Sequence, residues 1–194
     1  MKNFELKNFP FEHDGMTYWW SRSLTGVNVV FCYSKSDNEW CVLADKRGEG
    51  CPTCIGMWNV PCGYCDTNET VKQTAIRESL EESGVTIPKD KCKFFTLNTI
   101  PHGKFQNYNA TFYTILDGDV TDYPTSNEFN EPNETSDIRW IPISKLDEYK
   151  FAFNQAPIIK YLYSKFVAVC WFKKMLIRLS DWLDGYVGKE YLSL

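Results

Sequence analysis

Three glutamates with helical spacing are the strongest candidates for chemistry in this chain. Glu78, Glu81 and Glu82 occupy relative positions i, i+3 and i+4 within residues 71–82, a stretch that contains no glycine or proline. On an α-helix this spacing places the three carboxylates within about a 100° arc. Such carboxylates repel one another, and they are the oxygen ligands that Mg²⁺ or Mn²⁺ prefers. The pattern fits either a metal site or an ordinary solvated acidic face.

The residues around these glutamates favour the metal site. Gly63 is followed after five residues by Glu69, and after seven more by the run from Arg77 to Val85 with the sequence RESLEESGV. This arrangement resembles the Nudix box, G-x5-E-x7-R-E-U-x-E-E-x-G-U, in which U is a bulky aliphatic residue. Ser79 departs from the pattern because it stands at an aliphatic position. We expect softer core packing at Ser79 and unchanged chemistry.

The resemblance to the Nudix hydrolase family implies a fold and a set of roles. The fold is α/β, an α/β/α sandwich with a mixed sheet. The implied metal ligands are three carboxylates and one carbonyl oxygen, from Glu78, Glu81, Glu82 and Gly63. Glu69 and Arg77 are implied to be structural, and an ion pair between them is physically reasonable.

The resemblance also implies a reaction. Family members cleave a pyrophosphate linkage in a nucleoside diphosphate joined to another moiety, such as an ADP-ribose-like nucleotide-sugar, a dinucleotide or a nucleoside triphosphate. A metal-activated water attacks phosphorus, and a base must accept its proton. Among Glu128, Glu131 and Glu134 we favour Glu134 as a catalytic base, although all three also fit solvated loop acids. The alternative function is a non-catalytic nucleotide-binding regulatory module on the same fold.

Two residues upstream of the box are candidates for substrate binding. Arg47 could contact a substrate phosphate, or it could equally pair with a surface carboxylate. Trp58 could stack on a nucleobase. In a chain with 16% aromatic residues, core packing is the simpler interpretation of any single aromatic side chain.

Two C-x2-C pairs raise the possibility of a structural zinc ion. Cys51 and Cys54 are separated by seven residues from Cys62 and Cys65, and four thiolates can form a closed tetrahedral site. The short separation between the pairs favours the other interpretation, in which the cysteines are free thiols that pack as small apolar residues. Both interpretations remain open from the sequence.

Apolar periodicity and turn residues predict the elements that position these groups. A helix is expected between Asp66 and Gly84, with Asp66 and Glu69 as a capping box and Gly84 as a left-handed cap. A second helix is expected from Pro157. Strands are expected at residues 27–31, 40–43, 57–60, 94–100, 108–116 and 138–143.

Length and charge set the domain organisation and the class of partner. The chain has 194 residues, which favours one domain at residues 26–165, an N-terminal extension at 1–25 and an amphipathic helical extension at 166–194. The net charge of −4 argues against nucleic-acid binding through a basic surface. Lysine and glutamate residues interrupt the apolar pieces at residues 1–10, and five basic residues interrupt the most apolar late segment at 158–179. We therefore expect a cytoplasmic protein without a membrane segment or signal peptide. The expected partners are a nucleotide substrate and, by resemblance, a second subunit in a homodimer.

Overall fold

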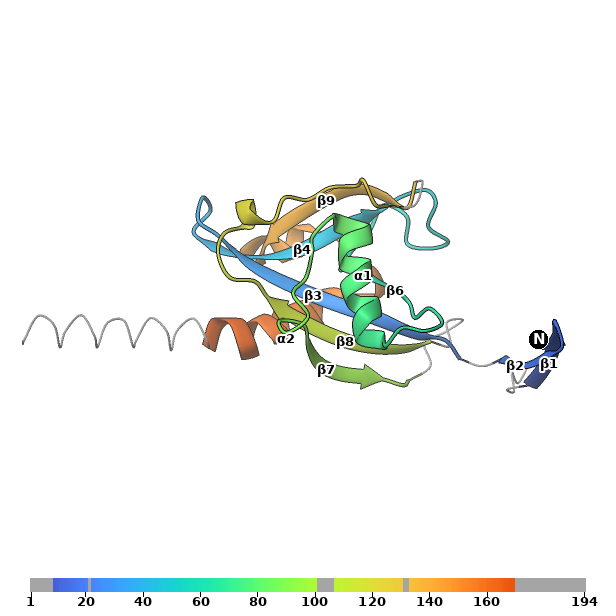
Figure 1. Cartoon of the computed structure of the whole chain (residues 1–194). Coiled ribbons are helices and arrows are strands. Elements are labelled where there is room, and N and C mark those ends of the chain that lie inside the picture. The colour runs from blue at the N-terminus through green and yellow to red at the C-terminus, as the bar shows by residue number, and fades with distance from the viewer. Residues whose placement is uncertain (1–8, 21, 101–106, 131–132, 170–194) are drawn as a thin grey trace, which may run out of the picture.

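The computed structural model describes residues 9–20, 22–100, 107–130 and 133–169 (Figure 1). Most of the predicted extension at 166–194 therefore lies outside the described residues. The first two strands, β1 (Phe9–His13) and β2 (Met16–Trp20), form an antiparallel hairpin. Asp14 and Gly15 both have positive φ at its turn, as a two-residue hairpin loop requires. Figure 1 shows this hairpin set apart from the main sheet.

One mixed sheet forms the body of the molecule. Its strands are β3 (Leu24–Ser34), β4 (Glu39–Arg47), β5 (Trp58–Asn59), β6 (Cys62–Tyr64), β7 (Lys93–Asn98), β8 (Tyr108–Ile115) and β9 (Thr135–Pro142). The main order is β5-β4-β3-β8-β7, while β6 also pairs with β3 and β9 with β4. The β3 and β8 strands are parallel and the other pairs are antiparallel.

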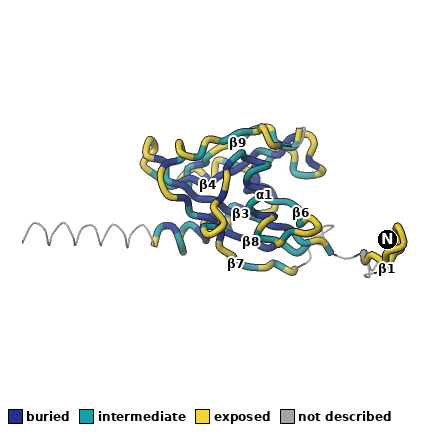
Figure 2. The backbone as a smooth tube through the Cα atoms, viewed as in Figure 1, coloured by how far each residue is buried: buried dark blue, intermediate teal, exposed yellow. Residues whose placement is uncertain are grey.

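Two α-helices cover opposite faces of this sheet. Helix α1 (Val71–Ser83) packs on the face that presents Val30 and Leu43, and α2 (Gln155–Leu162) packs on the face that presents Val29 and Val42. Neighbouring residues of one strand thus enter different cores, as the alternation of side chains along a strand requires. Figure 2 shows the buried backbone concentrated in the strands between the helices. The predicted α/β/α sandwich is confirmed.

Short helical segments complete the described chain. They are η1 (Val120–Asp122), η2 (Ile143–Glu148), η3 (Ala152–Asn154) and η4 (Tyr163–Ala168). Helix α2 begins two residues before the predicted start at Pro157, which therefore lies in the first turn, where the missing N–H of proline costs least. Within the described residues, no helix has the length and apolarity needed to cross a membrane.

The start of α1 differs from the prediction. Thr70 is the N-cap, and Thr70 and Gln73 make the reciprocal capping box that was predicted for Asp66 and Glu69. Glu69 does accept from the backbone N–H of Asp66 at 2.9 Å. Asn68, however, has a φ of 74°, and this left-handed residue breaks the helical path before Thr70. The predicted end is confirmed, because Gly84 caps the helix in the left-handed conformation.

Ser79 is integrated into the core by hydrogen bonds. Its side chain is fully buried, and its Oγ donates to the carbonyl of Ala75 at 2.8 Å. Asn28 of β3 donates to the same Oγ at 3.0 Å and accepts from Thr114 of β8 at 3.0 Å. The expectation of softer packing therefore did not include these hydrogen bonds, which compensate for the missing aliphatic side chain. A buried polar chain joins α1 to two central strands in place of the aliphatic contact.

Candidate functional site

The N-terminal half of the box is a network of paired charges. Arg77 Nη2 lies 2.9 Å from Glu69 Oε1, and Arg77 Nε donates to Glu69 Oε2 at 3.3 Å. The same Nη2 donates to the carbonyl of Tyr64 at 3.0 Å, and Thr74 Oγ1 donates to Glu69 at 2.8 Å. The Arg77 guanidinium lowers the pKa of Glu69 to about 2. These contacts fasten the loop after β6 to α1, which is the structural arrangement that the box resemblance implies.

Arg77 also engages two of the three predicted metal ligands. Its Nη1 lies 2.8 Å from Glu78 Oε1 and 2.6 Å from Glu81 Oε2. The Glu81 side chain is 43% exposed, so it turns outward from the sheet toward the arginine. Arg77 Nη1 therefore bridges Glu78 and Glu81, and Glu81 is held at the arginine on the more exposed side of the helix.

Glu78 and Glu82 lie on the buried side of α1, against β6. The carboxylate of Glu78 packs directly on Gly63, and a Cβ at residue 63 would overlap it. Glu82 is 3% exposed and accepts from the backbone N–H of Cys62 at 2.8 Å. Burial raises the pKa of Glu78 to about 7. Burial, followed by the charges of Asp45 and Glu78, raises the pKa of Glu82 well above its ordinary value. The box glycine thus provides the room in which a buried glutamate reaches the loop.

A fourth acidic residue, Asp45 of β4, joins this group and was not among the predicted site residues. It is 2% exposed and alternates with Leu43 on the face of β4 that α1 covers. Burial raises its pKa to about 8, with the charges of Glu134 and Glu78 acting in the same direction. The sequence held a signal for it, since an aspartate at an inward position of an apolar strand is rare without a partner.

Glu134 lies immediately before β9 and faces the same acidic group. Its carbonyl accepts from the N–H of Gly48 at 2.6 Å and from Cys51 Sγ at 3.2 Å, which ties it to the end of β4. Its charge contributes to the raised pKa values of Asp45, Glu78 and Glu82. Among the other candidate bases, Glu128 is exposed and Glu131 lies outside the described residues.

The two predicted substrate-binding residues have different environments. Arg47 is largely buried at the end of β4, donates from Nε to the carbonyl of Thr53 at 3.0 Å, and holds its guanidinium 5.3 Å from the ring centre of Phe153. Trp58 is 7% exposed and lies in the core on the α2 face, edge-on to Tyr149. This position fits the core-packing interpretation of Trp58, because the indole faces away from the box helix.

The four cysteines do not assemble into a zinc site. Cys62 Sγ contacts the side chain of Asn59, Cys65 Sγ contacts the carbonyls of Asp66 and Glu69, and Cys51 contacts Glu134. Throughout the part of the chain that the structure describes, no group of three or more His, Cys, Asp or Glu side chains converges as metal ligands would. The zinc prediction is therefore not supported, and the cysteines fit the thiol interpretation.

The acidic group nevertheless has the chemistry of a site for a hard cation. Its donors are carboxylate oxygens from α1, β4 and the residue before β9, which is the donor type that Mg²⁺ and Mn²⁺ prefer. Asp45 Oδ1 is buried and has no hydrogen-bond partner among the described residues. The box glutamates do not yet converge on one point, since Glu81 is held by Arg77. The donor type of Glu78, Glu82 and Asp45 thus suits a divalent cation, while their positions among the described residues are not yet those of a formed metal site.

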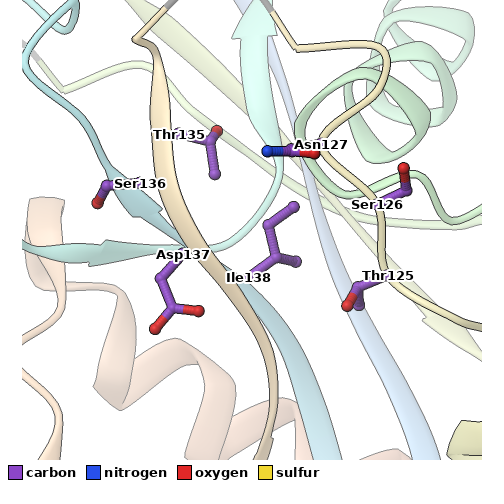
Figure 3. A pocket seen from close by; sticks show the side chains of 7 residues that line it. All are labelled: Thr125, Ser126, Asn127, Thr135, Ser136, Asp137 and Ile138. Atoms are coloured by element: carbon purple, nitrogen blue, oxygen red, sulfur yellow. The ribbon is translucent and has the colours of Figure 1, made fainter.

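A pocket of about 300 Å³ adjoins this group between the loop at residues 125–127 and the start of β9 (Figure 3). Ser126 donates its backbone N–H to the carbonyl of Ser83 at 2.9 Å, which attaches the loop to the end of α1. Figure 3 shows Asn127 of the loop opposite Thr135 of β9, with Ile138 below them in this view. Its lining is mostly polar, from Thr125, Ser126, Asn127, Thr135, Ser136, Asp137 and Ile138.

Comparison with known proteins agrees with this fold. Residues 23–162 match the NUDIX domain family, and the chain belongs to that family. It is 36% identical over 103 residues to an oxidized purine nucleoside triphosphate hydrolase of Danio rerio, a match that covers 52% of this chain and 56% of that protein. The chain thus spans little more than half the length of this curated relative.

Two solved structures have the same fold at low sequence identity. The NUDIX domain of Shewanella oneidensis NrtR, in complex with ADP ribose, has a TM-score of 0.62 at 19% identity and covers 76% of this chain and 90% of its own. A bifunctional NMN adenylyltransferase/ADP ribose pyrophosphatase of Francisella tularensis, in complex with AMP and a Mn ion, has a TM-score of 0.58 at 16% identity. That match covers 75% of this chain and 42% of the Francisella chain.

Proposed function

We propose that this protein is a metal-dependent pyrophosphohydrolase that cleaves a nucleoside diphosphate joined to another moiety. The observation that carries the proposal is the complete box, whose Glu82 is buried beside Asp45, while Asp45 Oδ1 has no hydrogen-bond partner among the described residues. Unpaired buried carboxylates are costly and are retained where they bind something.

The residues that would hold the cation are the box carboxylates and the carbonyl of the box glycine: Glu78, Glu81, Glu82 and Gly63. A bound Mg²⁺ or Mn²⁺ supplies a more acidic water and neutralises charge on the phosphate oxygens. Glu81 is partly exposed and is paired with Arg77, so it can exchange the arginine for the cation without leaving α1. Arg77 keeps Glu69 and the carbonyl of Tyr64 as partners when this happens.

Glu134 is the proposed proton acceptor for the attacking water. Its charge contributes to the raised pKa values of Glu78, Glu82 and Asp45, which supports a base within electrostatic reach of the proposed metal ligands and from a different segment. A general base must reach the attacking water, and its carboxylate must not itself coordinate the cation. Arg47 is the proposed contact for a substrate phosphate, because it is a largely buried cation whose charge acts on Asp45.

The polar pocket is the proposed site for the hydroxyl-bearing part of the substrate. Thr135 directly follows Glu134, and Ser126 is bonded to Ser83, the residue after Glu82. The hydroxyl of Thr135 is buried without a partner among the described residues, so a substrate hydroxyl could satisfy it. The pocket thereby favours a nucleotide-sugar or a dinucleotide over a substrate that ends in bare phosphate.

The relatives support a nucleotide as the substrate class. The Danio rerio relative is named as a nucleoside triphosphate hydrolase, and the two solved structures hold ADP ribose or AMP. For this chain we carry over the class alone, which comprises nucleotide-sugars, dinucleotides and nucleoside triphosphates. A cytoplasmic location and a homodimer complete the proposal.

The test is a hydrolysis assay with the full chain on a panel of these compounds. With Mg²⁺ or Mn²⁺ we expect release of a nucleoside monophosphate or pyrophosphate from at least one compound, and no release in EDTA. Turnover that continued in EDTA, or no turnover on the whole panel, would contradict the proposal. Nucleotide binding without turnover would instead identify the alternative, a non-catalytic regulatory module.

A further inference from the structure

Asp45 is the most buried acidic residue beside the box and does not belong to it. It lies near the end of β4, where its backbone pairs with Asn59 of β5 on one side and Ile138 of β9 on the other. Because residues 43 and 45 share one face of the strand, Asp45 points toward α1, as Leu43 does. It therefore approaches Glu82 from the sheet side, opposite the helix that carries the box.

The surroundings of Asp45 leave its charge poorly balanced. Only 2% of the residue is exposed, and Oδ1 has no hydrogen-bond partner among the residues the structure describes. Glu78, Glu82 and Glu134 add negative charge on the same side, and Arg47 opposes them. A buried carboxylate oxygen without a donor carries a large desolvation cost.

Asp119 is a second buried aspartate, and its hydrogen bonds provide a comparison for Asp45. It is 6% exposed, comparable to Asp45, yet Oδ2 accepts from the backbone N–H of Lys35 and Oδ1 from that of Thr121, both at 3.0 Å. These donors lower its pKa. The two aspartates are similarly buried and differ in that Asp119 is saturated with donors and Asp45 is not.

We infer that Asp45 is a further ligand of the divalent cation, contributed by β4 to a site that the box alone does not complete. The inference rests on the proposed function, since it concerns the same cation. A cation is the partner that fits, because an ionised Oδ1 can only accept, and the neighbouring carboxylates also only accept when ionised. Arg47, the neighbouring cation, donates its Nε to the carbonyl of Thr53. Asp45 and Glu82 would then hold the cation between sheet and helix.

The inference predicts that replacing Asp45 has different effects on protein stability without and with the metal ion. In EDTA, replacing Asp45 by the isosteric asparagine removes one of several crowded negative charges. In Mn²⁺ the same replacement removes a ligand. The binding of Mn²⁺ stabilises only the folded chain, so a lost ligand appears as a smaller metal-induced rise in melting temperature.

The experiment is a Mn²⁺ titration of the full chain, with free Mn²⁺ followed by electron paramagnetic resonance and melting temperature measured in parallel. Wild type, Asp45→Asn and the matched control Asp119→Asn are compared. We expect Asp45→Asn to weaken Mn²⁺ binding by about 10- to 100-fold and to melt no lower than wild type in EDTA. Asp119→Asn should melt lower in both conditions and bind Mn²⁺ as wild type does.

Equal Mn²⁺ affinity of wild type and Asp45→Asn would overturn the inference and leave the proposed function intact. No Mn²⁺ binding by wild type would overturn the proposed function and the inference together. If Asp45→Asn does not fold, Asp45→Ser takes its place in the same titration, and wild-type affinity in that variant would overturn the inference equally.

Discussion

The two halves of the box treat their carboxylates in opposite ways. Glu69, in the N-terminal half, is paired with Arg77 and receives a hydrogen bond from Thr74, and its pKa falls to about 2. Glu82, in the C-terminal half, is buried beside Asp45, and its pKa rises. The residues are of the same type and one helix organises both of them. The difference teaches that the first half neutralises its carboxylate, whereas the second half keeps unfavourable charge, which a cation would neutralise under the proposed function.

Arg77 is the boundary between the halves. It holds Glu69 with two nitrogens while Nη1 reaches across to Glu78 and Glu81. One guanidinium thus supports the scaffold and also partly neutralises the acidic half. Variants of Glu69 should therefore lower mainly the stability of the protein, and variants of Glu82 should lower mainly its hydrolytic activity.

The largest effect is expected for Glu82→Gln. Removing this proposed ligand should cost several kcal/mol of transition-state stabilisation, or about 10³-fold in hydrolysis rate. The fold should persist, since the amide can still accept from the N–H of Cys62. Steady-state kinetics measure the loss, and exposed Glu148→Gln is the control that should match wild type. A Glu82→Gln variant with wild-type activity would contradict the claim that the C-terminal half of the box binds the metal ion.

A large loss of stability is expected for Arg77→Gln. The change leaves Glu69 and Glu78 without their cation and should lower the free energy of unfolding by about 2–3 kcal/mol. Urea unfolding measures it. Lys160→Gln, which breaks the exposed 2.6 Å pair with Asp147, should cost about 0–1 kcal/mol. Equal losses in the two variants would show that Arg77 is not a special support.

A moderate, pH-dependent effect is expected for Glu69→Gln. The pKa of Glu69 is about 2 in the folded protein, below its ordinary 4.5, so its contribution to stability is present above pH 4.5. That contribution is lost as the pH falls from 4.5 toward 2. Glu69→Gln should therefore be less stable than wild type at pH 7, with the gap closing in acid. A gap that stayed constant with pH would rule out the ion pair as its source.

The smallest effect is expected in the polar pocket. Thr135→Val removes one unpartnered hydroxyl, and a substrate hydrogen bond of about 1 kcal/mol corresponds to a several-fold rise in KM with little change in kcat. Ser136→Ala is the comparison, because its hydroxyl already donates to the carbonyl of Lys46 at 3.1 Å. That variant should leave KM unchanged. A KM unaffected by Thr135→Val would place the substrate elsewhere.

The sequence predicted the sandwich and the helix end because these depend on local patterns. Alternating and helical apolar spacing marked the strands and helices, and Gly84 marked the cap. The N-cap was assigned to Asp66 because the left-handed turn at Asn68 has no clear sequence signal. Glu78 and Glu82 share one helix face, so their proximity was readable from spacing alone.

Asp45 could not be placed in the site from the chain alone. It lies 37 residues before Glu82 in the sequence, and the pairing of β4 beneath α1 brings the two residues together. The same limit applies to Ser79, whose partners Asn28 and Thr114 come from two other strands. Contacts of this kind follow from strand order, which periodicity does not encode.

The most direct test of the contrast is the unfolding free energy of Glu82→Gln and Glu69→Gln in EDTA and in saturating Mn²⁺. We predict that Glu82→Gln is at least as stable as wild type in EDTA and gains much less stability from Mn²⁺. Glu69→Gln should be less stable than wild type in EDTA and still gain from Mn²⁺. If Glu82→Gln gained as much from Mn²⁺ as wild type, the buried carboxylates would not be held for a cation.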